Sequence, residues 1–306
     1  MKGGAAMEPS GVIIINKPEG MTSHDVVNKM RRLFSTRRVG HTGTLDPMAT
    51  GVLVILIGRA AKAAEYLSSD EKGYLATLRL GTTYDTEDIT GTPLVTSDSI
   101  PSEEAVYSTI DTFVGDIKQI PPMYSALKVN GQKLCDLARK GVEIEREARP
   151  VTIFSIDTKK GELPTDYTLS VRCSAGTYIR TLCADIGAAL GCGGAMATLC
   201  RTLAGGFSID SSHTLEELEA LTLDERLSLL IPTESLFYDL DTVNLPAFYE
   251  KLCRNGCEIY LSKLRTSLEL GKRVRLCSQS GEFFALGEVR EFENGLAIKA
   301  IKLFDI

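Results

Sequence analysis

Apolar residues recur along the chain with two spacings, and a spacing of two predicts strands. Residues 72–80 alternate between the two sides of an extended chain. Short continuous apolar runs over 11–16 and 52–58 predict buried strands that are bounded by turn residues. The further predicted strands cover 151–158 and 166–173, joined by a Lys-Lys-Gly turn, and 273–277, 283–289 and 296–302.

A spacing of three and four residues predicts helices between these strands. Val26, Val27, Met30 and Leu33 form one apolar stripe, and Ser23 is the predicted N-cap of their helix. The other segments with helical character are 60–67, 102–112, 134–139, 177–190 and the acidic stretch 210–230, whereas 37–50 and 82–93 are predicted loops. Strands and helices in this irregular order predict an α+β fold rather than alternating βαβ units.

The character of the sequence changes near residue 240, which predicts two domains. We expect a main body over 11–240 and a small β-rich domain over 241–306. The first ten residues are small and polar, and they predict a disordered tail.

The composition of the 306 residues is that of a globular protein, with 43% hydrophobic and 24% charged residues. The longest aliphatic run, Val52 to Ile57, is too short for a membrane span, and the N-terminus does not resemble a secretory signal. The eight cysteines form no C-x-x-C pair and no zinc-ligand spacing. We therefore expect free thiols in a reducing cytoplasm, no membrane association and no metal or cofactor.

The net charge of −6 argues against non-specific binding of nucleic acid, but the charges are unevenly distributed. Bases outnumber acids by six to two over 17–38, by seven to four over 118–149 and by seven to two over 251–275. The stretch 85–116 has eight acids and no base. This pattern is compatible with a directed positive surface that binds a polyanion, and also with ordinary solvated faces.

The most distinctive segment is the loop Gly40-His41-Thr42-Gly43-Thr44-Leu45-Asp46-Pro47-Met48-Ala49-Thr50-Gly51. Its glycines permit close backbone approach and positive φ angles, and Asp46 could present its carboxylate from a rigid loop. An ordinary Asx-turn is the alternative interpretation, because Asp before Pro is common in turns. The loop is not a P-loop, since no Gly-Lys-Ser/Thr follows it.

This loop resembles the catalytic motif of the TruB family of tRNA pseudouridine synthases, and other blocks match in the family order. The matching blocks are Ile15 to Gly20, Lys72-Gly73-Tyr74, Gln119 to Lys128, Gly131, Arg146 to Pro150 and Cys173 to Leu182. The resemblance covers roughly residues 11–235. One departure is Cys200-Arg201, where the family usually has two arginines, and this puts one basic contact in doubt.

The resemblance implies a pseudouridine synthase fold with a mixed, mainly antiparallel sheet, and an isomerase that needs no cofactor or metal. Asp46 would be the essential carboxylate, which either attacks the sugar C1′ or removes a sugar proton. Arg180 would keep that carboxylate charged. Tyr74 would stack on the target base and assist removal of the C5 proton.

The resemblance also implies several substrate-binding residues. Tyr178 and Leu199 would line the pocket and Asp88 would lie near it, while His41 would fill the space that the extruded base leaves. Lys17 and Lys128 are predicted phosphate contacts, and ordinary packing or solvation is the alternative for each of these residues.

The implied substrate is the T-arm stem-loop of tRNA, modified at uridine 55 by a monomer without an obligatory protein partner. The basic segment 118–150 would form an RNA-binding flap, and the C-terminal domain would be a PUA-like RNA-binding domain. One rival is a non-catalytic protein that assists tRNA folding, a role that could coexist with catalysis. The others are a small-glycoside hydrolase, which would need a second acid, and a guide-RNA-dependent synthase.

Overall fold

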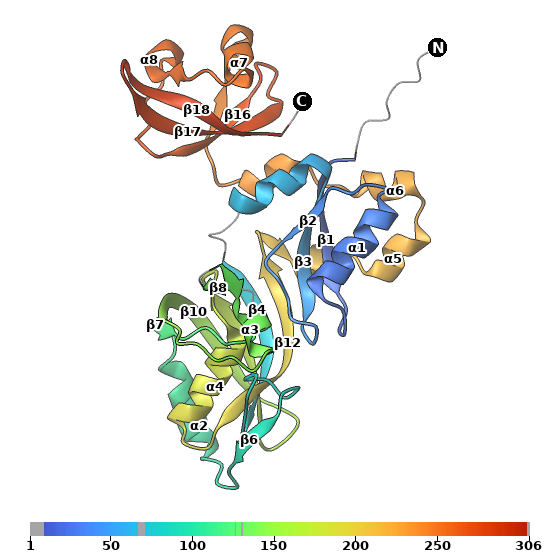
Figure 1. Cartoon of the computed structure of the whole chain (residues 1–306), viewed down its shortest axis with the longest axis vertical. Coiled ribbons are helices and arrows are strands. Elements are labelled where there is room, and N and C mark those ends of the chain that lie inside the picture. Colours follow the sequence, from blue (N-terminus) through green and yellow to red (C-terminus); the bar gives the residue numbers. More distant parts are fainter. Residues whose placement is uncertain (1–8, 67–70, 126, 130, 305–306) are drawn as a thin grey trace.

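The computed structural model describes residues 9–66, 71–125, 127–129 and 131–304, and for Lys128 and Lys133 only the backbone. Within these residues, two large sheets form the body and the C-terminal unit (Figure 1). The body has a nine-stranded sheet in the order β1-β3-β12-β4-β11-β10-β7, with β2 on β3 and β13 on β12. The C-terminal sheet has the order β14-β16-β17-β18-β15. This arrangement of segregated sheets and helices confirms the predicted α+β class.

The strands of the body sheet are β1 (Gly11–Lys17), β2 (Val39–Thr42), β3 (Thr50–Ile57), β4 (Lys72–Leu80), β7 (Gly115–Gln119), β10 (Arg149–Lys160), β11 (Asp166–Cys173), β12 (Gly194–Ala204) and β13 (Phe207–Ser208). The C-terminal strands are β14 (Thr242–Asn244), β15 (Ile259–Tyr260), β16 (Arg273–Cys277), β17 (Phe283–Phe292) and β18 (Gly295–Leu303). Two small hairpins pair β5 (Thr82–Tyr84) with β6 (Pro93–Thr96) and β8 (Lys128–Val129) with β9 (Gln132–Lys133).

Helices cover the body sheet in two groups (Figure 1). The helices are α1 (Ser23–Leu33), α2 (Glu103–Asp111), α3 (Leu134–Ala138), α4 (Ile179–Ala189), α5 (Leu215–Ala220), α6 (Leu223–Ser228), α7 (Ala247–Arg254) and α8 (Leu261–Leu264), with 3-10 turns η1 (Gly58–Tyr66), η2 (Ile209–Ser211) and η3 (Thr233–Phe237). Apolar residues of α2 and α4 share one core with β4, β10, β11 and β12. Those of α1 and α5 share another with β1 and β3. Among the described residues, no helix is long and apolar enough to cross a membrane.

The two halves of the body sheet meet where β12 pairs with β3 in parallel at only two positions, Cys200 with Thr50 and Arg201 with Gly51. Gly51 has a φ of +96°, and a Cβ atom at this position would lie 2.2 Å from the backbone oxygen of Arg201. Only glycine permits this close approach. The last glycine of the distinctive loop therefore joins the Asp46 loop to the central strand.

Several sequence-based assignments need correction. Thr22, not Ser23, caps α1, because the Thr22 hydroxyl accepts the Asp25 N–H in a capping box. The segment 37–50 is not all loop but contains β2, and 82–93 begins with β5. The sequence reading missed β7 and β12, since neither has a clear alternation bounded by turn residues. The other predicted strands and helices are present, with shifted ends.

The C-terminal unit packs against the body through an apolar cluster and through η1. Leu286 and Phe304 join buried residues of β1 and β3 around Phe237. The Lys62 ammonium donates to the Leu303 carbonyl at 3.0 Å, and other side chains of η1 also contact β18. The unit is β-rich as expected but contains two short helices. The predicted tail lies outside the described residues except for Pro9 and Ser10.

Candidate active site

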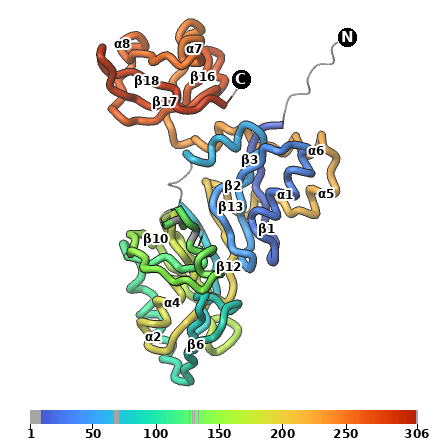
Figure 2. Tube along the Cα trace, in the orientation of Figure 1, coloured from blue at the N-terminus to red at the C-terminus, as the bar shows by residue number. Residues whose placement is uncertain are grey.

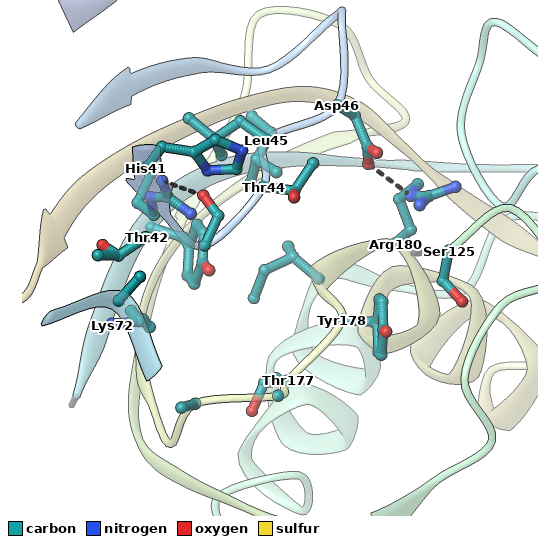
Figure 3. A pocket seen from close by; sticks show the side chains of 18 residues that line it. His41, Thr42, Thr44, Leu45, Asp46, Lys72, Ser125, Thr177, Tyr178 and Arg180 are labelled. Atoms are coloured by element: carbon teal, nitrogen blue, oxygen red, sulfur yellow. Dashed lines mark hydrogen bonds and ion pairs between the residues drawn. The ribbon is translucent and has the colours of Figure 1, made fainter. Parts of the chain in front are cut away.

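A cavity of about 440 Å³ opens beside the paired strands β12 and β4 (Figure 3). Figure 2 traces the path of the chain through β12 and the other labelled elements of the body. Most of the cavity walls come from β2 and the loop after it, strand β4, the segment at the start of α4 and strand β12, and Ala64 of η1 and Ser125 complete the lining. The lining residues are His41, Thr42, Gly43, Thr44, Leu45, Asp46, Ala64, Lys72, Tyr74, Ser125, Ala175, Gly176, Thr177, Tyr178, Ile179, Arg180, Leu199 and Arg201. The fold thus brings together most of the residues that the motifs singled out.

Asp46 and Arg180 face each other across this cavity and form an ion pair (Figure 3). The Asp46 Oδ2 atom lies 3.0 Å from Arg180 Nε, and 37% of the Asp46 side chain is exposed against 6% of the Arg180 side chain. Burial raises the pKa of the Asp46 carboxyl above its ordinary value, and the Arg180 guanidinium opposes this shift. Asp46 is therefore a partly desolvated carboxylate that Arg180 helps to keep ionised.

Arg180 contacts the loop after β5, at residues 86–88, as well as Asp46. Its Nη1 atom lies 3.7 Å from Asp88 Oδ2, and its other contacts are the carbonyls of Thr86 at 3.2 Å and Tyr124 at 2.7 Å. Asp88 is 5% exposed and accepts hydrogen bonds from Thr86 and Thr90. Asp88 thus lies behind Arg180 and positions it, as its predicted place near the site suggested.

Ser23 holds the Asp46 loop through two hydrogen bonds to its backbone, a role that the sequence did not reveal. The Ser23 hydroxyl accepts the Leu45 N–H at 2.8 Å and donates to the Leu45 carbonyl at 3.1 Å. Both bonds are buried. The residue that looked like a helix cap therefore fixes the residue immediately before Asp46.

We predict that Ser23→Ala lowers the free energy of unfolding by about 1–3 kcal/mol, because it leaves the N–H and the carbonyl of Leu45 buried without partners. It should also lower kcat, since Asp46 loses its support. Denaturant unfolding and single-turnover assays measure the two effects. Thr22→Ala, which removes only the exposed cap of α1, is the control and should leave kcat unchanged; equal kcat losses in the two variants would contradict a specific role for Ser23.

Lys17 is placed differently from the predicted phosphate contact. Its side chain is completely buried, and its ammonium donates to the carbonyls of Pro18 at 2.8 Å, Met21 at 2.6 Å and Pro47 at 3.2 Å. Burial lowers the pKa of Lys17 to about 8, with Asp46 opposing the shift. A buried ammonium that is saturated by carbonyls cannot reach solvent-exposed phosphates, so Lys17 supports the Asp46 loop instead.

The floor of the cavity is one face of two paired strands. Tyr74 and Ala76 of β4 lie opposite Arg201 and Leu199 of β12, respectively. Since side chains two residues apart point to the same face, all four share the cavity side of the sheet. Arg201 is 2% exposed and was not predicted as a site residue. Recognition of β12 as a strand would have revealed it, because 199 and 201 have the strand spacing.

Tyr178 is the N-cap residue immediately before α4, and it is held by a second residue that the motifs did not single out. The Gln119 side chain accepts the Tyr178 N–H at 3.0 Å and donates to the Tyr178 carbonyl at 3.2 Å. Gln119 is 2% exposed and ends β7. This paired contact fixes the backbone at the N-terminus of the helix that carries Arg180.

His41 lies on β2 with its ring toward the cavity (Figure 3). Its Nδ1 atom is buried and has no hydrogen-bond partner among the described residues, and burial lowers the pKa of the imidazole. The side chain of Lys128 lies outside the described part of the structure. Within that part, no group of three or more His, Cys, Asp or Glu side chains is arranged to hold a metal ion.

Comparisons with known proteins show the family of this chain. A family model described as the N-terminal domain of TruB family pseudouridylate synthase matches residues 31–179, and the tRNA pseudouridylate synthase B C-terminal domain matches residues 180–238. A tRNA pseudouridine synthase B of Clostridium kluyveri is 44% identical over 294 residues, which are 96% of this chain and 99% of that protein. One of Dechloromonas aromatica is 47% identical over 253 residues, which are 82% and 84% of the two chains.

A solved structure shares the fold. A chain in the crystal structure of a Cbf5-Nop10-Gar1 complex has a TM-score of 0.74 and 25% identity, with 96% of this chain and 85% of that chain covered. The matched family models and the bacterial relatives therefore define a pseudouridine synthase, an isomerase. Within this class, the chain belongs to the TruB family.

Proposed function

We propose that this protein converts uridine 55 in the T-arm loop of tRNA to pseudouridine, with Asp46 as the essential carboxylate. The observation that carries this proposal is the Asp46–Arg180 ion pair inside a cavity whose lining also includes Tyr74 and Leu199. The names of the bacterial relatives support tRNA as the substrate.

The chemistry needs an ionised carboxylate beside the sugar. The bond between N1 and C1′ breaks, the base turns, and C5 bonds to C1′; the proton on C5 then leaves and N1 gains one, so no atom is added or lost. Asp46 either attacks C1′ or removes a sugar proton to give a glycal. Tyr74 and Leu199 form the wall against which the uracil ring packs.

A uridine inside a folded loop must leave its stack to reach this cavity. We assign His41 to the space that the base leaves, because an imidazole whose pKa is lowered stays neutral and can stack between bases. The segment 118–150 would be the RNA-binding flap, and the C-terminal domain over 241–306 would be a PUA-like domain. A monomer suffices, since one chain supplies all the lining residues.

Pseudouridine mapping on an unmodified tRNA transcript tests the proposal. Wild-type protein should convert one T-loop uridine, whereas Asp46→Asn should convert none. Conversion at another position would contradict the substrate assignment, and conversion by both proteins would contradict the role of Asp46. Tight tRNA binding without conversion by either protein would favour the rival role of a tRNA-folding factor.

Lys17 and Lys140 differ in their predicted contribution to RNA affinity. Lys140 is exposed on the flap segment. Lys140→Ala should therefore reduce the magnitude of the negative slope of log K for tRNA binding against log salt by about 0.9, the duplex value for one lost phosphate contact. Lys17→Met should leave this slope unchanged, because the Lys17 ammonium is buried. Filter binding of tRNA at several salt concentrations measures both slopes, and a reduced slope for Lys17→Met would contradict the structural role.

A further inference from the structure

Arg201 is a buried cation on the floor of the cavity, and its contacts are unusual. Its Nε atom donates to the Val52 carbonyl at 2.7 Å and its Nη2 atom to the Gly43 carbonyl at 2.9 Å. Tyr74 is its partner across the two strands, and both side chains line the cavity. Among the described residues, no carboxylate forms an ion pair with Arg201, so all its partners are neutral.

A buried guanidinium without an anionic partner is costly. An apolar side chain would stabilise the fold more than a buried guanidinium at a position that only had to fill space between β12 and β3. Arg201 would recover part of this cost whenever a negative charge forms next to it. Within the part of the chain that the structure describes, the titratable acid opposite Arg201 in the strand register is the phenol of Tyr74, and the two groups act on each other electrostatically.

The charges around Tyr74 are consistent with such a role. The groups that act on Tyr74 are Arg201 of β12, Cys173 of β11 and Asp46 of the loop. Burial raises the pKa of the phenol, Cys173 and Asp46 act in the same direction, and only Arg201 lowers it. Arg201 is thus the group that can make a tyrosinate accessible in this cavity.

We propose that Arg201 is a positioning residue that orients the Tyr74 hydroxyl toward the cavity and stabilises its tyrosinate for removal of the C5 proton. This inference rests on the proposed function. In the step, the C5–H bond breaks and its proton bonds to the tyrosinate oxygen. The electron pair of that bond forms the C5–C6 double bond while the π pair of the N1–C6 double bond moves to N1. N1 then takes a proton from water, and the phenol later returns its proton to water.

A merely structural role is the rival explanation, because Arg201 also holds Gly43, three residues before Asp46. The test must therefore report on the C5 proton itself. Arg201→Gln, which keeps side-chain donors but no charge, and Arg201→Lys are compared in single-turnover reactions on tRNA transcripts that carry 5-deuterated or ordinary uridine. The same substitutions are made in a Tyr74→Phe background.

We expect Arg201→Gln to slow conversion about 100-fold, the low end of the effect of general acid–base catalysis, with unchanged tRNA affinity. A primary isotope effect at C5 should appear or grow, and Arg201→Lys should restore part of the rate. In the Tyr74→Phe background, Arg201→Gln should cost much less. Additive rate losses with an unchanged isotope effect would overturn the inference.

A second measurement does not depend on the folding of the Arg201 variants. Difluorotyrosine at position 74, with Arg201 intact, lowers the pKa of the phenol and should shift the acid limb of the single-turnover rate to lower pH. An unshifted limb would overturn the inference. Absence of any conversion by the wild-type protein would instead contradict the proposed function itself, so the two failures are distinguishable.

Discussion

Asp46→Asn should abolish conversion of uridine, with a loss in kcat on the order of 10³-fold or more. The substitution keeps the size of the side chain but removes the negative charge, so neither attack on C1′ nor removal of a sugar proton remains possible. The Asp46 carboxylate lines the cavity, and its Oδ2 atom lies 3.0 Å from Arg180 Nε. Mapping of pseudouridine after single-turnover incubation measures the loss.

The same substitution should not weaken the fold. Burial raises the pKa of Asp46 in the folded protein above its unfolded value, so its stabilising contribution is lost as the pH rises through the folded pKa. At neutral pH the ionised Asp46 therefore costs stability, and the neutral amide should leave Tm unchanged or higher. Asp98→Asn, which removes an exposed charge of the acidic segment, is the matched control and should retain full activity. Retained activity in Asp46→Asn would contradict the assignment.

The sequence predicted the parts of this site that lie in contiguous motifs. The loop around Asp46 and the strand with Tyr74 are each continuous in the chain, so their residues could be assigned before their positions were known. The carboxylate of Asp46 and the guanidinium of Arg180 meet as the resemblance implied.

Contacts between distant segments could not be predicted in the same way. Lys17 is a cation in a basic segment, as expected of a phosphate contact. Its burial, however, depends on the turn 18–21 and on Pro47, 30 residues away. Arg201 could be placed in the site only if β12 was recognised as a strand. The sequence of β12, GAMATLCRTLA, contains small and polar residues that obscure the alternation of apolar and polar positions. Such assignments depend on tertiary packing, which overrides local propensity.

Arg180→Met should destabilise the protein most strongly at neutral pH, by about 3 kcal/mol. The substitution removes the cation between Asp46 and Asp88 and leaves both carboxylates without it. It should also abolish conversion, because the pKa of Asp46, which Arg180 lowers, would rise further. Thermal unfolding of wild type and variant between pH 4 and pH 8 measures the difference in stability.

The pH dependence of that difference identifies its cause. Protonated Asp46 needs no cationic partner, so the variant gains stability as the pH falls through the raised folded pKa of Asp46 toward its unfolded value. The gap in Tm between wild type and Arg180→Met should therefore narrow on acidification. The same comparison is made without the carboxylate, between Asp46→Asn and Asp46→Asn/Arg180→Met. The gap in Tm between these two variants should be smaller at neutral pH and depend less on pH. If the gap in Tm stays constant with pH in both comparisons, Arg180 stabilises the fold through its bonds to the carbonyls of Thr86 and Tyr124 rather than through Asp46.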